Sequence, residues 1–326
     1  MEYRSLGHTG LRVSVLGFGC GAIGGLLVRG EGDEQRRAVA RALEASINYF
    51  DTAVAYGDGK SEEVLGGILR ELRAEPYVGT KFRVELSGGA DIPEQIRRSL
   101  EGSLRRLGME RVDLFQLHNR IGSDPSGERE ALPVDVVLGP VAEGLAAVRE
   151  AGLTRFIGIT GMGDTAALHQ VIDSGVYDTA QCYVNALNPS AGWLVERDGA
   201  QNFDGLVGKA AAANVGVIAI RVLAAGALAL QEQRHPNAGD PGSPLVRGSG
   251  YAEDLQRARD LDALARELGM EGAAELSYRL VLSHPGVSTA LVGASDVSQL
   301  EDALRRVERG PLEPATLERV VALAAG

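Results

Sequence analysis

Four side chains that could together move a proton stand at or just beyond short apolar runs of the sequence. In chain order they are Asp51, Tyr56, Lys81 and His118. A carboxylate, a phenol, an ammonium and an imidazole gathered at one point can give a proton to a substrate oxygen or take one from it. Tyr56 is the least expected of the four, because it stands in a glycine-containing loop with no apolar period around it. These residue types predict acid–base chemistry on a small bound molecule.

Lys81 is the most informative of the four, because this sequence otherwise uses arginine for nearly all of its positive charge. Lysine occurs only at positions 60, 81 and 209 among 33 basic residues. A cation beside a phenol favours the phenolate and lowers the phenol pKa from its free value near ~10. We therefore expect Tyr56 to act as the general acid and base, with Lys81 tuning it and Asp51 holding the lysine in place.

Each of these residues also has an ordinary structural explanation. A lysine at a strand end can reach solvent, a tyrosine can pack in a turn, and an aspartate can cap the next helix. His118 alone would more often be structural than catalytic, although an imidazole at the end of VDLFQLH could donate a hydrogen bond to a substrate oxygen. Their joint occurrence at successive strand ends favours the chemical interpretation.

The elements that must bring these residues together are short apolar runs that alternate with longer segments of helical period. The predicted strands are Val15–Gly19, Tyr49–Asp51, Tyr77–Lys81, Val112–His118, Phe156–Thr160, Thr179–Tyr183, Gly216–Ile220 and Thr289–Val292. The predicted helices are Asp33–Ala45, Ser61–Arg73, Pro93–Leu107, Val141–Ala151, Asp164–Asp173, Phe203–Ala213, Glu253–Leu268 and Val297–Glu308. Eight such units predict an α/β protein with a (β/α)8 TIM barrel, in which the carboxyl ends of all strands meet at one rim.

Segments outside the eight units are also interpretable. A hairpin around Gly7–Gly10 would plug the bottom of the barrel, and extra helices are expected at Ala273–Leu282 and Pro314–Ala325. No Pro- or Gly-rich linker divides the pattern, so we expect residues 1–326 to form a single domain. Three long polar connections follow strands and would shape substrate choice on the active face. They are Asn119–Gly139, Val184–Asn202 and Ala229–Gly250.

A Rossmann dinucleotide fold is the main competing interpretation. GCGAIG, residues 19–24, matches the GxGxxG pattern after an apolar strand, and Asp51 ends the next strand. In that motif the helix begins inside the glycines, whereas here residues 24–33, GGLLVRGEGD, delay the predicted helix until Asp33. A Rossmann sheet also does not supply eight even units, so the barrel is favoured.

Composition excludes several classes of function. The net charge of −11 and pI of about 5.1 give no basic footprint for nucleic acid or an anionic membrane. The N-terminus lacks the pattern of a secretion signal, and no apolar run reaches the ~20 residues of a membrane span. Two cysteines are too few for a disulfide framework, so a cytoplasmic location is the expectation. Five scattered histidines without HxH or HExxH spacing predict no metal site.

The sequence resembles the aldo-keto reductase family over essentially its whole length. The resemblance is carried by LGHTGLRVSVLGFGC, NYFDTAVAYGDGKSEEVLG, VGTKF, VDLFQLH, FIGIT, QCYVN and LVGASDVSQLEDAL. Matched position by position, the family's catalytic tetrad falls on Asp51, Tyr56, Lys81 and His118. The resemblance implies a (β/α)8 barrel that binds NAD or NADP in extended form across the rim. It also implies hydride transfer between the nicotinamide and a carbonyl carbon, with Tyr56 protonating the oxygen.

The resemblance further implies a set of cofactor-binding residues. Thr160 and Gln181 would face the carboxamide, Gly19 and Cys20 would approach through their backbone, and Gly293 and Ser295 would meet the adenosine phosphate region. The full set implied is Gly19, Cys20, Thr160, Gln181, Arg221, Leu223, Gly293, Ser295, Asp296 and Gln299.

Several positions depart from the common family pattern. Gly161 replaces a usual Asn, Ile220 stands where an aromatic usually stacks on the nicotinamide, and Ala303 replaces another Asn. Asp296 occupies a frequently basic position and would repel a 2′-phosphate, so the sequence favours NAD. FIGITG is also similar to the branch of L-galactose and related sugar dehydrogenases, which favours NAD as well. Arg305 or Arg306 could still reach a phosphate, which keeps NADP open. Ser46 stands where glycine usually closes a helix in the left-handed conformation, with no functional account.

These observations predict an NAD(P)-dependent oxidoreductase that interconverts carbonyl and alcohol groups. A sugar or a small polar aldehyde or ketone is the expected substrate, suggested slightly by polar loops that carry Asn185, Asn188, Trp193 and Arg221. An alternative from another class is a cofactor-binding regulatory or redox-sensing barrel with little turnover. A metal-dependent barrel hydrolase or isomerase is a third alternative. The sequence leaves the natural substrate, the preferred direction and the oligomeric state open.

Overall fold

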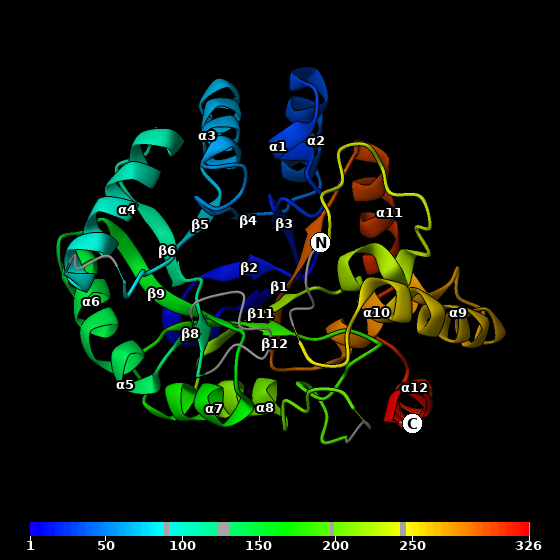
Figure 1. Ribbon diagram of the computed structural model, residues 1–326. Coiled ribbons are helices and arrows are strands. Elements are labelled where there is room, and N and C mark those ends of the chain that lie inside the picture. The colour runs from blue at the N-terminus through cyan, green and yellow to red at the C-terminus, as the bar shows by residue number, and fades with distance from the viewer. Residues whose placement is uncertain (88–90, 123–130, 196–198, 242–245, 326) are drawn as a thin grey trace.

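A closed barrel of parallel strands lies at the centre of the computed structural model, which describes residues 1–87, 91–122, 131–195, 199–241 and 246–325 (Figure 1). The barrel strands are β3 Leu16–Gly19, β4 Tyr49–Asp51, β5 Tyr77–Phe82, β6 Val112–Leu117, β9 Thr154–Gly161, β10 Thr179–Tyr183, β11 Gly216–Ile220 and β12 Val287–Gly293. They follow one another around the ring in chain order, and β12 pairs with β3 to close it. The predicted TIM barrel is confirmed.

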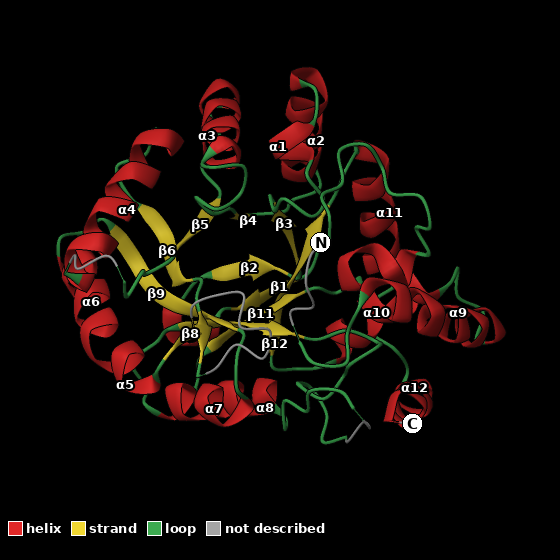
Figure 2. Cartoon of the chain, in the orientation of Figure 1, coloured by secondary structure: helices red, strands yellow, loops and turns green. Residues whose placement is uncertain are grey.

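Helices form the outer layer and strands the inner one (Figure 2). The helices are α1 Leu26–Arg29, α2 Gly32–Glu44, α3 Lys60–Leu72, α4 Ile92–Leu107, α5 Val134–Val136, α6 Ala142–Glu150, α7 Thr165–Asp173, α8 Leu206–Ala212, α9 Tyr251–Glu267, α10 Ala273–Ser283, α11 Val297–Glu308 and α12 Pro314–Ala325. Shorter turns are the 3-10 helices η1 Gly7–Thr9 and η3 Ala224–Ala229 and the π-helical turn η2 Val137–Val141. In α2, for example, Ala38, Val39 and Ala42 form a buried apolar stripe.

Predicted and observed elements differ by one to three residues at most ends. The helix expected from Phe203 begins at Leu206, because Gly205 before it is left-handed with a φ of 66°. Ser46 takes the left-handed conformation expected after α2, with a φ of 65°. The short parallel pair β7 Arg120–Ile121 and β8 Ala131–Leu132 was not predicted. Residues 123–130, 196–198 and 242–245 of the three long connections lie outside the described residues.

An N-terminal hairpin closes the bottom of the barrel, as predicted. Its strands, β1 Tyr3–Ser5 and β2 Arg12–Ser14, pair antiparallel across η1 and lie over the middle of the ring in Figure 1. Gly7 has a φ of +53°, and a Cβ there would stand 2.3 Å from the backbone nitrogen of Gly216. The hairpin therefore touches the first residue of β11 at a point where no side chain would fit.

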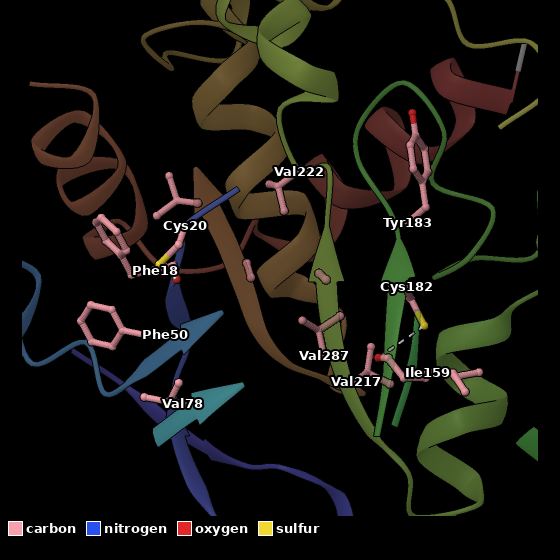
Figure 3. Close-up of a cluster of buried hydrophobic side chains, with 14 of the residues drawn as sticks. Phe18, Cys20, Phe50, Val78, Ile159, Cys182, Tyr183, Val217, Val222 and Val287 are labelled. Atoms are coloured by element: carbon pink, nitrogen blue, oxygen red, sulfur yellow. Dashed lines mark hydrogen bonds between the residues drawn. The ribbon is translucent and has the colours of Figure 1, made fainter. Parts of the chain in front are cut away.

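Side chains of the barrel strands alternate between the interior and the helix layer. Phe50 points outward, where its ring lies 5.4 Å from that of Phe18, and both are labelled in the apolar cluster of Figure 3. Cys20 and Cys182 belong to the same buried cluster as free thiols. Because Phe50 points outward, Tyr49 and Asp51 on either side of it point into the barrel interior. This alternation places the strand-end carboxylate where the chemistry was expected.

Two further classes of feature were searched among the described residues. None of their helices is long and apolar enough to cross a membrane. No group of three or more His, Cys, Asp or Glu side chains in the described ranges could hold a metal ion.

The ionisable side chain of His8 fastens the N-terminal hairpin to the loops at the bottom of the barrel. His8 Nδ1 lies 2.8 Å from the carbonyl oxygen of Asn214, and Nε2 lies 2.8 Å from a carboxylate oxygen of Asp178. Both partners only accept hydrogen bonds, so both ring nitrogens can donate only when the imidazole is protonated. The hydrogen bond to Asp178 is the main cause that raises the pKa of His8, while burial and the nearby Arg149 act against it.

A raised histidine pKa has a defined effect on stability. The stabilisation is fully present below the unfolded-state pKa of ~6.5 and is lost as the pH rises through the folded-state value. We predict that wild type is more stable than His8→Gln by about 0.5–1 kcal/mol near pH 5.5, since His8 is half-exposed and solvent screens the contact. The difference should shrink by pH 9 in urea unfolding. His169→Gln is the control, because His169 contacts the carbonyl oxygen of Phe203 instead of a carboxylate. A difference for His8→Gln that does not change with pH would contradict this account.

Candidate active site

The structure brings the four predicted catalytic residues to one point on the rim. Asp51 ends β4, Lys81 lies in β5, His118 directly follows β6, and Tyr56 lies in the loop between β4 and α3. The loop is a closed turn, because the backbone N–H of Tyr56 donates to Ala53 and its carbonyl accepts from Ser61. Lys81 stands on the strand next to Asp51, as the parallel pairing of β4 and β5 requires.

Lys81 is fully buried and all three of its N–H groups have acceptors. The ammonium donates to Asp51 Oδ1, to the carbonyl oxygen of Thr52 at 2.8 Å and to the hydroxyl of Tyr56 at 3.2 Å. Burial is the largest single effect and lowers the pKa of Lys81, but the charge of Asp51, Tyr56 and the hydrogen bonds to both together outweigh it, and the pKa is raised. The lysine is therefore held as a cation in direct contact with the phenol.

The donor and acceptor roles at Tyr56 follow from this contact. An ammonium has no lone pair, so the Tyr56 oxygen accepts from Lys81 and the phenol hydrogen must point elsewhere. Tyr56 lines a cleft, which gives that hydrogen a direction in which a substrate oxygen could lie. The His118 and Tyr56 rings are nearly perpendicular, at 87°, with the centroids 5.8 Å apart. Phenol and imidazole thus stand together at one end of the cleft.

Ser61, expected to be the first residue of a helix, also stabilises the loop that contains Tyr56. It lies in the first turn of α3, which begins at Lys60. Its hydroxyl donates to the carbonyl oxygen of Cys20 at 2.9 Å and lies 2.9 Å from the hydroxyl of Thr52. Ser61 therefore ties the Tyr56 loop to the end of β3.

The cleft extends from Asp51, Tyr56 and His118 across the rim toward α9, α10 and α11, with a volume of about 650 Å³, and Lys81 lies buried behind its wall. Most of the predicted cofactor-binding residues line it: Gly19, Thr160, Gln181, Arg221, Leu223, Gly293, Ser295 and Gln299. An elongated cleft with the proton-transfer residues at one end suits an extended dinucleotide.

Two residues of the predicted cofactor set, Cys20 and Asp296, are not part of the cleft wall. Cys20 is buried, and its backbone N–H donates to the carbonyl oxygen of Asp51 at 2.9 Å. Asp296 caps α11, where its carboxylate accepts from the backbone N–H of Gln299 at 2.9 Å. The other oxygen of Asp296 lies 3.6 Å from His235 Nε2. Arg305, an alternative phosphate ligand, is paired with Glu271 and Asp302, whereas Arg306 lines the cleft.

Thr160 provides a test of whether the cleft suits a nicotinamide. Its Oγ1 is buried and lacks a hydrogen-bond partner within the described part of the chain, although Thr160 lines the cleft. Buried hydroxyls are normally hydrogen-bonded, so this one suits a polar group of a bound molecule such as a carboxamide. The residues present therefore fit the implied cofactor.

Gly161 explains one departure from the family pattern. A Cβ at this position would lie 2.7 Å from the carbonyl oxygen of Gln181 on the neighbouring strand. An Asn side chain cannot be accommodated there unless β9 and β10 move apart.

Several residues of the cleft were not found by sequence reasoning. Segment 230–239 contributes Arg234, and the far end is lined by Asp262, Arg266, Glu271, Glu275 and Asp302, beside the Arg306 that the sequence had suggested. Segment 230–239 is held over the rim by bonds from Gly239 N–H to Ile23 and from the Asn237 amide to Ser295. The only available signal was the length of the connection that contains it.

Of the four polar loop residues that suggested a sugar substrate, only Arg221 lines the cleft. Asn185 and Asn188 are buried and bond to backbone groups of their own and neighbouring loops. Trp193 packs edge-on against His284, with centroids 5.3 Å apart. These three side chains therefore stabilise the loops, and they give no information about the substrate.

Within the barrel, a phenol, a cation and a carboxylate are linked by hydrogen bonds beside the cleft, and these are the residue types that acid–base chemistry needs. The Aldo/keto reductase family model matches residues 15–325, and the chain belongs to that family of oxidoreductases. It is 30% identical to the L-galactose dehydrogenase of Arabidopsis thaliana over 334 aligned positions, covering 99% of this chain and 94% of the relative.

Solved structures show the same fold. The aldo-keto reductase AKR11C1 of Bacillus halodurans in its holo form superposes with a TM-score of 0.72 at 24% identity, covering 98% of this chain and 96% of the other. The glycerol dehydrogenase AKR11B4 of Gluconobacter oxydans gives a TM-score of 0.70 at 24% identity, covering 97% and 92%.

The close approach at Gly161 yields a prediction about stability. We expect Gly161→Ala and Gly161→Asn to lower the free energy of unfolding by about 1–3 kcal/mol, because the added Cβ forces two paired strands apart. The control is Gly208→Ala, since a Cβ at this position in α8 meets nothing within 4 Å. That change should be neutral or stabilising by about 0.5–1 kcal/mol, because alanine loses less entropy in a helix. Equal effects at both glycines in chemical denaturation would contradict the steric explanation.

Proposed function

We propose that this protein is an NAD(P)-dependent oxidoreductase that interconverts carbonyl and alcohol groups, with Tyr56 as general acid and base. The contact from the Lys81 ammonium to the Tyr56 hydroxyl, at 3.2 Å, carries the proposal. It leaves the phenol hydrogen directed away from the lysine at the inner end of the cleft. We further propose that the chain works as a single cytoplasmic domain, consistent with its two buried free cysteines.

Each catalytic residue has a separate task. When bound, the nicotinamide supplies or accepts the hydride at the substrate carbon. In reduction, Tyr56 gives its proton to the substrate oxygen, and in oxidation it takes that proton back. Lys81 stabilises the negative charge that Tyr56 then carries, and Asp51 keeps Lys81 in place. His118, whose ring lies perpendicular to that of Tyr56, orients the same substrate oxygen by donating a hydrogen bond.

The cofactor would lie along the cleft wall. Thr160 would bond the carboxamide through its unpartnered Oγ1. Gln181 uses its amide nitrogen on Asp51, which leaves its amide oxygen for the same carboxamide. Gly19 and Gly293 line the wall without side chains, so a bound molecule can approach the backbone there. The remaining wall residues proposed to contact the cofactor are Arg221, Leu223, Ser295 and Gln299.

NAD is the cofactor that the charges favour. Asp296 directly follows Ser295, which lines the cleft, and would repel a phosphate on the adenosine ribose. The four acids at the far end of the cleft, Asp262, Glu271, Glu275 and Asp302, are ion-paired with Arg266, Arg279, Arg305, Arg306 and Arg309. They therefore add no excess of negative charge, and the preference for NAD rests on Asp296.

A sugar or another small polyol is the proposed substrate class. The support comes from the relative named L-galactose dehydrogenase, which shares 30% identity over nearly the whole chain. Small-molecule specificity would be set by residues around Tyr56 and His118, among which Met162 and Arg83 line the cleft.

Tyr56→Phe tests the proposed general acid and base. We expect the variant to lose about 10²–10⁴-fold in kcat with aldehydes and sugars, because the proton donor is removed while the ring is kept. Dinucleotide affinity, measured by fluorescence titration, should change less than about threefold. Turnover is measured as absorbance of the reduced cofactor.

Tyr3→Phe is the matched control, because its hydroxyl donates to Ser46 at the bottom of the barrel. It should keep wild-type turnover. If no substrate of the panel exceeds the blank with wild type while dinucleotide binds, the regulatory or redox-sensing alternative is favoured. Retained turnover in Tyr56→Phe would remove the proposed role of this phenol.

Asp296→Asn tests cofactor preference without removing the helix cap, since asparagine caps as well as aspartate. We expect NADP to bind about three- to tenfold more tightly to the variant, with NAD affinity nearly unchanged, because one like charge is removed. Asp296→Arg should increase the effect. Unchanged NADP affinity in both variants would show that Asp296 does not discriminate between the cofactors.

A further inference from the structure

A second buried phenol lies directly beneath the catalytic carboxylate. Tyr49 precedes Asp51 by two residues in β4, so both side chains point into the barrel. The hydroxyl of Tyr49 donates to Asp51 Oδ2 at 3.0 Å, whereas Lys81 binds Oδ1. The two oxygens of Asp51 therefore have separate partners. Oδ1 binds Lys81, which contacts Tyr56, and Oδ2 binds Tyr49 at the floor of the barrel.

The Oδ2 side of Asp51 carries three donors. Besides Tyr49, the side-chain amide nitrogens of Gln181 and Gln116 lie at 2.7 Å and 3.4 Å. Gln181 lines the cleft, and the 3.4 Å contact of Gln116 is long for a hydrogen bond. Gln181 therefore binds Asp51 from the cleft side, and Tyr49 binds it from the floor of the barrel.

The hydroxyl of Tyr49 keeps its proton and is a stable donor to Asp51. Tyr49 is fully buried, and its burial, followed by the charge of Asp51, raises the pKa of the phenol well above its usual value. Burying a hydroxyl without a partner is costly, so a tyrosine at this place is explained by the carboxylate it bonds. A phenylalanine would fill the same apolar space without the hydrogen bond.

The surroundings of Tyr49 provide room and support for this arrangement. A Cβ at residue 79 would lie 2.6 Å from the Tyr49 hydroxyl, so glycine there leaves the space that the hydroxyl occupies. The Tyr49 ring packs in the cluster at the barrel floor with side chains of the N-terminal hairpin, namely Leu6, Leu11 and Val13. Tyr49 therefore connects the hairpin that closes the barrel to the catalytic ion pair.

We propose that Tyr49 is a positioning residue of the active site, which orients Asp51 through Oδ2 so that Oδ1 stays aligned with Lys81. It does not touch the substrate, and it acts on Tyr56 only through Asp51 and Lys81. The kinetic test of this proposal rests on the proposed function, whereas the structural test by unfolding does not.

The structural test is a double-mutant cycle in urea unfolding, which requires no substrate. Tyr49→Phe should lower the unfolding midpoint by about 0.3–0.5 M, a typical loss for one buried hydrogen bond to a charged group. In the background of Asp51→Asn this loss should shrink by at least half, because the carboxylate acceptor is already gone. Tyr177→Phe is the control, since Tyr177 is equally buried but donates to the carbonyl oxygen of Val137. Its loss should be the same in both backgrounds.

A compensation test uses the space at residue 79. Gly79→Ala should lower the unfolding midpoint of wild type, because the new Cβ collides with the Tyr49 hydroxyl. The same substitution should cost less than half as much in Tyr49→Phe, in which the colliding atom is absent. Because neither Asp51 nor Lys81 is altered, this second test remains valid if the Asp51→Asn protein does not fold.

The kinetic test separates positioning from packing. Tyr49→Phe should lower kcat about tenfold while the affinity for NAD or NADP stays within twofold, because a displaced Asp51 disturbs the reactive end of the cleft only. Tyr177→Phe should leave kcat unchanged. Additive losses in the cycle, or equal kcat values for Tyr49→Phe and wild type, would overturn the proposal. If the cycle shows coupling but wild type turns over no substrate, the hold of Tyr49 on Asp51 stands and the proposed oxidoreductase function fails.

Discussion

The buried ion pair between Lys81 and Asp51 is the interaction on which the rest of the site depends. Transferring an ammonium and a carboxylate from water into the barrel costs several kcal/mol per ion unless their hydrogen-bonding capacity is satisfied. Here Lys81 uses all three donors, on Asp51, Thr52 and Tyr56. Asp51 accepts on both oxygens. The fold therefore holds a cation at full burial next to a phenol, a situation that an exposed loop could not maintain.

The proposed acid–base residues and most of the outer cleft are built by different parts of the chain. Asp51, Tyr56, Lys81 and His118 lie on β4, β5 and β6 or directly after them. The outer part of the cleft is built by segments that follow β11 and β12, together with α9, α10 and α11. Because these parts are separate in the chain, the segments of the outer cleft could change without displacing Lys81 and Tyr56. Loops that diverge on a constant barrel are the usual means by which this fold changes specificity.

Much of the architecture and the centre of the site could be predicted from local pattern. Apolar runs such as YVGTKF mark buried strands, and helical periods between them mark the outer layer, because burial on both faces leaves few residue types possible. The Asp51, Tyr56, Lys81 and His118 set follows from the same pattern, since strand ends meet at one rim. The pairing of β7 with β8 and the course of residues 230–239 could not be predicted, because both depend on contacts between loops that have no period of their own.

The sequence by itself determined the barrel, the location of its rim and the residue types gathered there, because alternation along a strand and the order of strands are local properties. Only the tertiary structure decided which hydrogen bonds those residues make. In the structure Asp296 caps a helix, and Asn185 and Trp193 pack within the loops and do not line the cleft. The hydroxyl of Tyr49 donates to the second oxygen of Asp51. Such contacts depend on distances of a few tenths of an ångström between segments far apart in the chain, and residue types and spacing along the chain do not specify those distances.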